Sequence, residues 1–314
     1  MAENLSNIVY VDISDFSCGG DLCEHKERTL SYALFVDIPQ QAETPDEVFK
    51  ECCYSHKVLA DLTSTESYKN DFSGFFHKRQ ISSETCDFVM VDTATSTEYV
   101  LNDSTYGTYN DFNSITGLPD LKTFKLDWKK VLQGLGSGSY KVLKRVVVVG
   151  VAVDIEYLVY NLYQYSSSLA NTTARIDVTM DGYLENIGVN FEGSGFETSL
   201  RVSGFFGRRN PKFEEDNIVN RDYEKRQISI KQTNEYKFQT NFIPVCLTSE
   251  IFDFLLMSDD IRISDYNLNN HSYSYRFTPV SIEENGEPVY LPQTRKAQLN
   301  VTFSDKVVNK IRRS

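Results

Sequence analysis

The stretch 125–165, near the middle of the chain, constrains the fold most, because no other segment is as apolar. In 125–132, apolar residues recur at mixed two- and three-residue intervals, which predicts an extended start followed by about one helical turn. Three glycines in 134–138 then predict a sharp reversal. Valine, isoleucine and tyrosine dominate 140–163. We therefore expect one long strand there, or two in succession, with both faces largely covered, joining an N-terminal half to a C-terminal half.

Length and charge limit what the two halves can be. A chain of 314 residues is long enough for about two domains. Its net charge of -12 argues against a nucleic-acid binder, because phosphate contacts depend on clustered lysine and arginine. Residues 1–20 lack a basic start followed by an apolar run, and Asp154 and Glu156 interrupt the best candidate for a membrane helix. We expect a soluble protein made in a cytoplasm, with no direct sequence-specific contact to nucleic acid and no contact to membrane.

The N-terminal half, 1–168, reads as a β-rich domain with irregular connections. Near period-two alternation predicts strands, and proline at position 45 predicts the start of a short helix. A segment dense in Asn, Asp, Ser, Thr, Gly and Tyr predicts a loop. The expected strands are 7–16, 29–38, 81–92 and 97–101, the helix is 45–54, and the loop is 102–117.

The C-terminal half, 169–314, begins after the polar break 166–168 and is predicted to be a second β-rich domain. Its clearest strand is 174–180, where Ile176, Val178 and Met180 alternate with polar residues, as in a half-buried strand. A strongly charged segment near 212–221 predicts an exposed loop or arm. One helix is predicted near 249–257. The other expected strands are 184–191, 196–206, 227–233, 236–245, 273–282 and 296–303.

Regularly spaced strands, many turns and few helices together predict a mainly β fold. We expect antiparallel β-sandwich or barrel modules with one or two short helices. Two short internal repeats favour a chain built of modules. Ser-Gly-Phe-Phe occurs at 73–76 and 203–206, and Lys-Arg-Gln-Ile-Ser occurs at 78–82 and 225–229. Because the two offsets differ, we expect no simple duplication, and a related pair of β modules stays an alternative.

Two motifs resemble ligand sites. A nucleotide-cradling loop needs a strand before its glycines and a helix after them, and the order around Gly134, Gly136 and Gly138 is reversed, so we favour a turn. Six cysteines in a chain of this length are no disulfide scaffold, and buried free thiols with surface histidines are the favoured interpretation. A tetrahedral zinc site stays an alternative, because soft ligands gather in the first 56 residues without paired C-x2-C spacing. Those ligands are Cys18, Cys23, His25, Cys52, Cys53 and His56.

Catalysis has weak support in the residues. A cysteine nucleophile needs a histidine base, and His77 and His271 lie in segments that predict charged or Asn-rich loops. Paired carboxylates are common in an acidic chain, and neighbours in solvated turns are not set across a cleft as glycoside hydrolysis requires. These pairs are at 214–216, 259–260 and 283–284. We therefore expect no enzyme and no catalytic, cofactor or metal site.

Several sequence segments resemble those of a family of structural proteins of tailed bacteriophages that infect Bacteroidota, including crAss-like phages. They are DW..VL..(G)SGSY.V at 127–142, SL..SGFFG.R.P at 199–211 with departures at several positions, EEDNI at 214–218, SDDIRISDYNLNNHSYSYRFTPV at 258–280 and TRKAQLNVTFSDK at 294–306. The resemblance covers about the C-terminal two thirds and carries no catalytic motif.

The resemblance implies a virion protein, a ring subunit in the neck, tail or baseplate that is assembled in the host cytoplasm. Its partners would be copies of itself and other tail, neck or portal-proximal proteins. A ring needs heterologous contacts, for which the segment 212–221 and the loop 264–274, with Asn267, Asn269, Asn270 and Tyr273, are candidates. The alternative is a carbohydrate- or receptor-binding β-sandwich module, since nineteen tyrosines and twenty phenylalanines suit protein contacts and sugar stacking.

Overall fold

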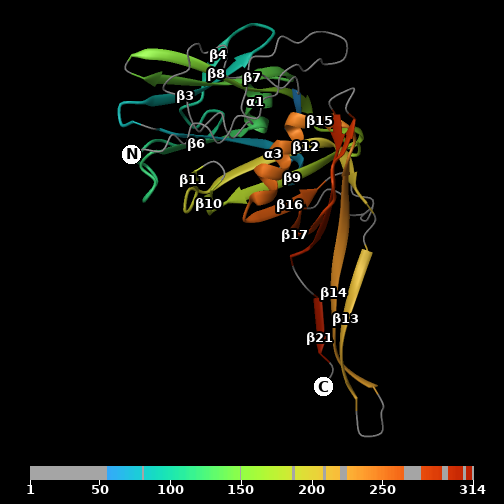
Figure 1. Ribbon diagram of the computed structural model, residues 1–314. Coiled ribbons are helices and arrows are strands. Elements are labelled where there is room, and N and C mark those ends of the chain that lie inside the picture. The colour runs from blue at the N-terminus through green and yellow to red at the C-terminus, as the bar shows by residue number, and fades with distance from the viewer. Residues whose placement is uncertain are drawn as a thin grey trace.

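Strands make up most of the chain that the structure describes, which confirms the predicted mainly β, antiparallel class. The computed structural model (Figure 1) describes residues 55–79, 81–148, 150–185, 188–207, 210–219, 225–264, 277–291, 296–306 and 309–312. The predicted strands 7–16 and 29–38, the helix 45–54 and the loop residues 265–274 lie outside these ranges.

One sheet is built around the apolar stretch in the middle of the chain. Its strands, in sheet order, are β1 (Ser55–Ala60), β8 (Val151–Gln164), β7 (Gly138–Val148), β3 (Thr85–Asp92) and β4 (Glu98–Val100). β7 and β8 form an antiparallel hairpin next to Gly150, which has φ of 81°, so the stretch holds two strands in succession. The expected burial of both faces is wrong near the hairpin, where Val151 is 65% exposed. The reason is that β1 pairs with β8 only over 159–164, leaving the rest of β8 without that neighbour.

A helix and a small sheet pack beneath this hairpin. The sheet holds β2 (Phe72–Lys78), β6 (Leu121–Asp127) and β5 (Gly107–Asn110), and the helix is α1 (Trp128–Leu135). β5 lies inside the predicted loop 102–117. The helix has two turns instead of one, because Asp127 caps it by accepting a hydrogen bond from the Lys129 amide and Gly136, at φ of 91°, ends it. Trp128 anchors it, fully buried, with its indole nitrogen donating to Ser73 Oγ at 2.9 Å.

Six strands of the C-terminal half close into an antiparallel barrel. They are, in order, β12 (Phe196–Phe206), β9 (Thr173–Met180), β16 (Asp260–Ser264), β17 (Thr278–Asn285), β20 (Asn300–Asp305) and β14 (Lys225–Thr240). β14 pairs back onto β12, which removes the two edges of the sheet. Phe206, Phe238 and Phe303 contact one another, with ring centroids 5.2 to 6.3 Å apart, and help to fill the core.

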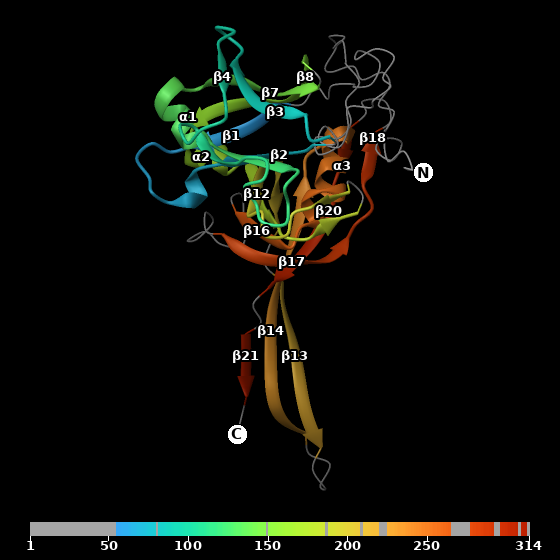
Figure 2. The ribbon, with the colours of Figure 1, turned by 90° about the vertical axis from the view of Figure 1, so that its left-hand side faces the viewer.

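A β-ribbon extends from the barrel, as Figures 1 and 2 show. It consists of β13 (Asn210–Val219), the first part of β14, and β21 (Asn309–Arg312), with β14 in the centre. The predicted charged loop at 212–221 is therefore wrong in kind, since 212–219 form a strand, although the expectation of an exposed arm holds. The sequence pattern does not predict this strand, because backbone pairing with β14 forms it. It has no buried face that would give alternation of apolar and polar residues.

Short elements complete the described residues. The predicted helix near 249–257 begins earlier, at Val245, directly after the short strand 243–244, and ends at Asp253. No helix in the described part of the chain is long and apolar enough to cross a membrane. The remaining elements are η4 (Ser67–Lys69), α2 (Ser167–Ala170), β10 (Tyr183–Leu184), β11 (Val189–Asn190), β15 (Ile243–Pro244), α3 (Val245–Asp253), η5 (Leu255–Met257), β18 (Val289–Leu291) and β19 (Lys296–Gln298).

The two halves meet where β2 crosses β12. A side chain on Gly74 would lie 2.2 Å from the Glu197 carbonyl oxygen, so the two backbones approach as closely as only glycine permits. Phe76 on β2 packs edge-on against Phe196 on β12, at 5.4 Å between ring centroids. One hydrophobic core runs across the polar break 166–168, and the division into domains 1–168 and 169–314 remains a prediction.

Candidate functional site

Four charged side chains are buried together where the two halves meet. Arg175 and Asp177 lie on β9, Arg201 lies on β12, and Asp71 precedes β2. Each is at most 2% exposed. The alternation in 174–180 predicts a strand with one solvent-facing side, and this is wrong, because the N-terminal half covers that side. Buried charges require partners, so the contacts among these four decide what the cluster can do.

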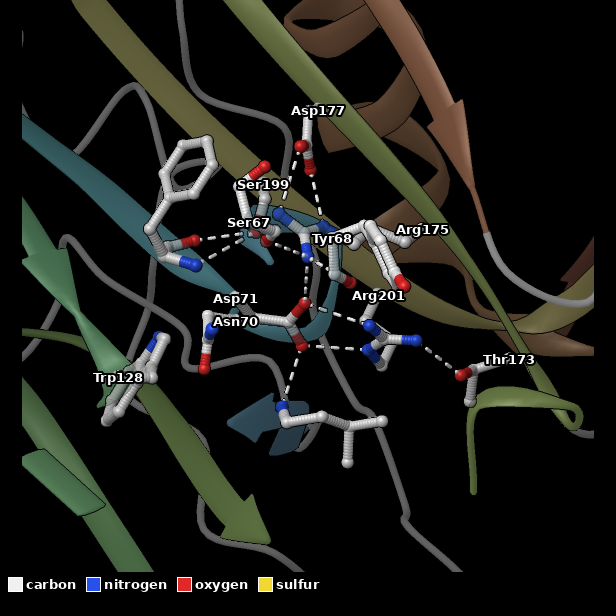
Figure 3. Close-up of polar contacts among 12 residues, drawn as sticks. Ser67, Tyr68, Asn70, Asp71, Trp128, Thr173, Arg175, Asp177, Ser199 and Arg201 are labelled. Atoms are coloured by element: carbon white, nitrogen blue, oxygen red, sulfur yellow. Dashed lines mark hydrogen bonds and ion pairs between the residues drawn. The ribbon is translucent and has the colours of Figure 1, made fainter. Parts of the chain in front are cut away.

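Asp71 is the centre of the cluster (Figure 3). Arg201 donates to both of its carboxylate oxygens, from Nε at 2.8 Å and from Nη2 at 2.9 Å. Arg175 Nη1 lies 3.0 Å from Oδ1, and the Leu59 amide donates to Oδ2 at 2.7 Å. Burial by itself raises the pKa of this carboxyl, but the two guanidinium groups outweigh burial and lower the pKa below its usual range.

The two arginines use their remaining donors within the protein. Arg175 forms a bidentate pair with Asp177, at 2.7 and 3.0 Å, and donates to the Tyr68 carbonyl at 3.0 Å. Arg201 Nη1 donates to Thr173 Oγ1 at 2.9 Å. With two cations and two anions, the formal charge of the cluster is zero. The arrangement therefore holds strands of both halves together and leaves no charged group poised to attack a substrate.

A polar cleft of about 450 Å³ lies above this network. Its walls bring together Lys125, Glu197 and the rings of Phe72 and Phe277, among other residues. The Lys125 ammonium is 2.5 Å from a Glu197 carboxylate oxygen and 4.2 Å from the Phe72 ring centroid. No histidine or cysteine occurs among the described residues that line the cleft. Lys125 pairs with Glu197, whereas Lys129 and Lys130 donate to the backbone carbonyls of Ser64 and Ser104, at 2.5 and 2.8 Å, so the cleft is a seam with room for a small ligand.

A second buried group lies in the N-terminal half. His77 Nε2 is 2.7 Å from Glu84 Oε1, and both side chains are buried. The predicted charged loop at His77 is wrong, because the residue lies in β2 and faces the core. Burial, helped by nearby Lys144, lowers its pKa to about 4, so the imidazole is neutral at pH 7. Burial raises the pKa of Cys86, on β3, to about 12, so this thiol stays protonated at pH 7.

The other predicted ligand residues are scattered. The glycines at 134, 136 and 138 end α1 and lead into β7, as the favoured turn requires. His56 is buried in β1 with its ring 5.4 Å from that of Tyr160, so the expectation of a surface histidine is wrong. Cys18, Cys23, His25, Cys52, Cys53 and His271 lie outside the described residues. Within those described, no cluster of His, Cys, Asp or Glu is arranged to hold a metal ion.

The acidic pairs serve local structure. An Asp259 carboxylate oxygen accepts a hydrogen bond from the Asp181 amide at 2.6 Å, and Asp260 pairs with Lys306 at 2.8 Å. A Glu283 carboxylate oxygen accepts from Ser304 Oγ at 2.6 Å. The carboxylates at 214–216 lie on the exposed β13 strand. None of these arrangements sets two carboxyl groups across the cleft.

Sequence reasoning missed Asp71 and Arg201. Asp71 reads as a polar connector, and nothing local marks it as buried. A signal exists only in the pairing of β9 with β12, where Arg175 and Arg201 are direct cross-strand partners. Two cations at one buried position are unfavourable unless an anion lies between them, and the N-terminal half supplies that anion.

Comparison with known proteins assigns no family. No protein-family model matches the chain, and no curated protein matches it. A crystal structure of a fragment of TarS from S. aureus is 9% identical with a TM-score of 0.20, and the match covers 84% of this chain and 59% of that one. A structural-genomics protein of unknown function from Bacteroides ovatus is 8% identical with a TM-score of 0.13, with 83% and 98% covered. Scores this low carry no argument about fold or function.

Proposed function

We propose that this chain is a virion structural protein, a ring-forming subunit of a bacteriophage tail or neck that acts through protein–protein contacts. The observation that carries the proposal is the ribbon of β13, β14 and β21, which extends from the barrel and whose β13 strand is exposed at each position from 210 to 217 and at Val219. The ten residues of β13 span about 33 Å at about 3.3 Å per residue. Phe213 on this strand is 61% exposed and Val219 54%.

An exposed ribbon of this kind needs neighbours. Small sheets without a covered face are marginally stable in water, and long open edges template pairing with other chains. A ring satisfies both needs, because each subunit covers its neighbour with the same pair of surfaces. The family resemblance of the C-terminal two thirds supports the same assignment and suggests a virion, assembled in the host cytoplasm, as the location.

A further exposed apolar segment suits contact with other virion proteins. All three residues of β18 are exposed, and Tyr290, at 54%, is the most exposed of them. Aromatic side chains of this type commonly anchor protein interfaces. We infer that the subunit contacts its own copies through the ribbon and other tail or neck proteins through surfaces such as β18.

The test is the state of assembly of the purified chain. Light scattering coupled to size exclusion should give the mass of a closed oligomer, and negative-stain electron microscopy should show rings of uniform diameter. A variant in which a two-residue turn replaces 211–234, between the paired residues Asn210 and Glu235, should remain folded and monomeric. A full-length chain that stays a dispersed monomer at every concentration would overturn the proposal.

A carbohydrate- or receptor-binding module is the second candidate, and the cleft favours it. Its volume of about 450 Å³ is in the range of small-ligand sites, and the rings of Phe72 and Phe277 reach it. In this case the monomer should bind a glycan, with affinity lost when Phe72 is replaced by alanine. Glycan-array binding by the monomer, measured alongside its mass, separates the two functions.

A further inference from the structure

The two long edges of the ribbon carry opposite charges. β13 contains three consecutive acidic residues, Glu214, Glu215 and Asp216, and no basic residue after Lys212. β21 contains Lys310 and Arg312 and no acidic residue. β14 lies between them and pairs with both. The ribbon therefore has an acidic edge, β13, and a basic edge, β21.

The register of the ribbon places these charges at matching heights. Lys231 of β14 pairs with Glu214 on one side and with Lys310 on the other. Two residues further towards the tip of the ribbon, Ser229 pairs with Asp216 and with Arg312. At each of these two levels, one edge carries an anion and the other a cation.

Both edges lack a strand neighbour within the described part of the chain. β13 pairs only with β14 there, and so does β21. Within its own ribbon, Glu214 forms a weak, exposed pair with Lys231, whose ammonium lies 3.5 Å away, and Asp216 accepts a hydrogen bond from Ser229 Oγ. An open edge with a row of charges binds best to an edge of opposite charge.

We propose that β13 of one copy pairs with β21 of the next copy, so that the ribbons join side by side into a continuous sheet around the ring. This inference rests on the proposed function and names its interface. Acidic edge meets basic edge, and two acidic edges repel, so the contact is heterologous, as a ring requires.

The joined strands run parallel. β13 and β21 are each antiparallel to β14, so both run in the same direction along the ribbon. Rotation about an axis along the ribbon preserves that direction, and the neighbouring β21 lies parallel to β13. At equal height Glu214 faces Lys310 of the next copy, and Asp216 faces its Arg312. A slide of two residues, as the tilt of a closed sheet can require, still places unlike charges opposite each other.

A cysteine pair tests this contact directly. Glu214→Cys and Lys310→Cys lie on opposite edges of one ribbon, about 10 Å apart across two strand spacings, which exceeds the about 7 Å that a disulfide spans. In a chain whose six native cysteines are replaced by alanine, both substitutions together should therefore give a ladder of cross-linked oligomers on non-reducing gels after mild oxidation. Each single variant should give no ladder, and a mixture of the two single variants should stop at dimers.

The outcomes separate the contact from the ring. Rings seen by electron microscopy without a ladder would overturn the edge contact and leave the proposed function standing. A chain that stays monomeric without a ladder would overturn both. A ladder together with rings supports both.

Charge exchange provides a second test with a built-in rescue. Glu214→Lys with Asp216→Lys makes both edges basic, and Lys310→Glu with Arg312→Glu makes both edges acidic. Each variant alone should lose assembly and remain folded by circular dichroism. The two variants mixed in equal amounts should co-assemble, and so should a chain with all four changes. Either variant assembling alone as the unchanged chain does would contradict the proposal.

Discussion

Replacing Asp71 by asparagine should lower the stability of this protein far more than such a conservative substitution usually does. The change keeps the shape of the side chain and removes one buried negative charge. Asp177, which pairs with Arg175, is then the one anion of the cluster, and the buried cluster goes from formally neutral to a net charge of +1. The new amide also directs N–H groups at guanidinium donors that previously found a carboxylate at 2.8 to 3.0 Å.

The expected cost is about 3 to 5 kcal/mol, the range for breaking a buried ion pair by removing one partner. Since small and medium domains have only about 5 to 15 kcal/mol of stability, this is a large fraction of the total. Urea unfolding measures the loss, and the single tryptophan, Trp128, reports on it because it is fully buried in α1. The protein concentration must be equal in all samples, since assembly adds to apparent stability.

Two comparisons make the result decisive. Asp154→Asn removes an exposed carboxylate that lies 2.7 Å from Arg145, and should cost less than about 1 kcal/mol. Adding Arg201→Met to Asp71→Asn restores formal neutrality and should recover about 1 to 3 kcal/mol. If Asp71→Asn is within about 1 kcal/mol of the unchanged chain, the network does not hold the two halves together as argued.

Three further predictions follow from buried groups. Gly74→Ala should destabilise the chain by about 2 kcal/mol or more in urea unfolding, because the added carbon meets the Glu197 backbone, whereas Gly138→Ala, with only ordinary contacts, should cost under about 1 kcal/mol. The pKa of His77 is about 4 in the folded chain, below its unfolded value. The contribution of His77 to stability should therefore be full above about pH 6.5 and fall by about 3 kcal/mol towards pH 4. His77→Gln should flatten that pH dependence. Trp128→Phe removes the hydrogen bond to Ser73 and should lower the thermal midpoint, at a cost of about 1 to 3 kcal/mol, with no change in circular dichroism.

Local pattern was sufficient to predict the class of fold and many of its elements. Alternation of apolar residues over 174–180 predicted β9, and the valine-rich stretch after the glycines predicted one long strand or two in succession, of which the structure has two, β7 and β8. These signals work because a strand with a period of two and a turn that needs glycine are properties of a few neighbouring residues. Local signals also set the two ends of α1. Asp127 caps its start and Gly136 ends it, and the helix between them is one turn longer than predicted.

Only the tertiary structure decided which polar residues are buried and which charged segment is a strand. The polar side of β9 has the composition of a solvent-facing surface, and it is buried because Asp71, more than 100 residues earlier in the chain, supplies the charge that Arg175 and Arg201 need. β13 looks like a loop because its side chains have no core to face, and pairing with β14 makes it a strand. Residue identity determines local preference, whereas burial and pairing depend on partners distant in sequence, and no local pattern carries them.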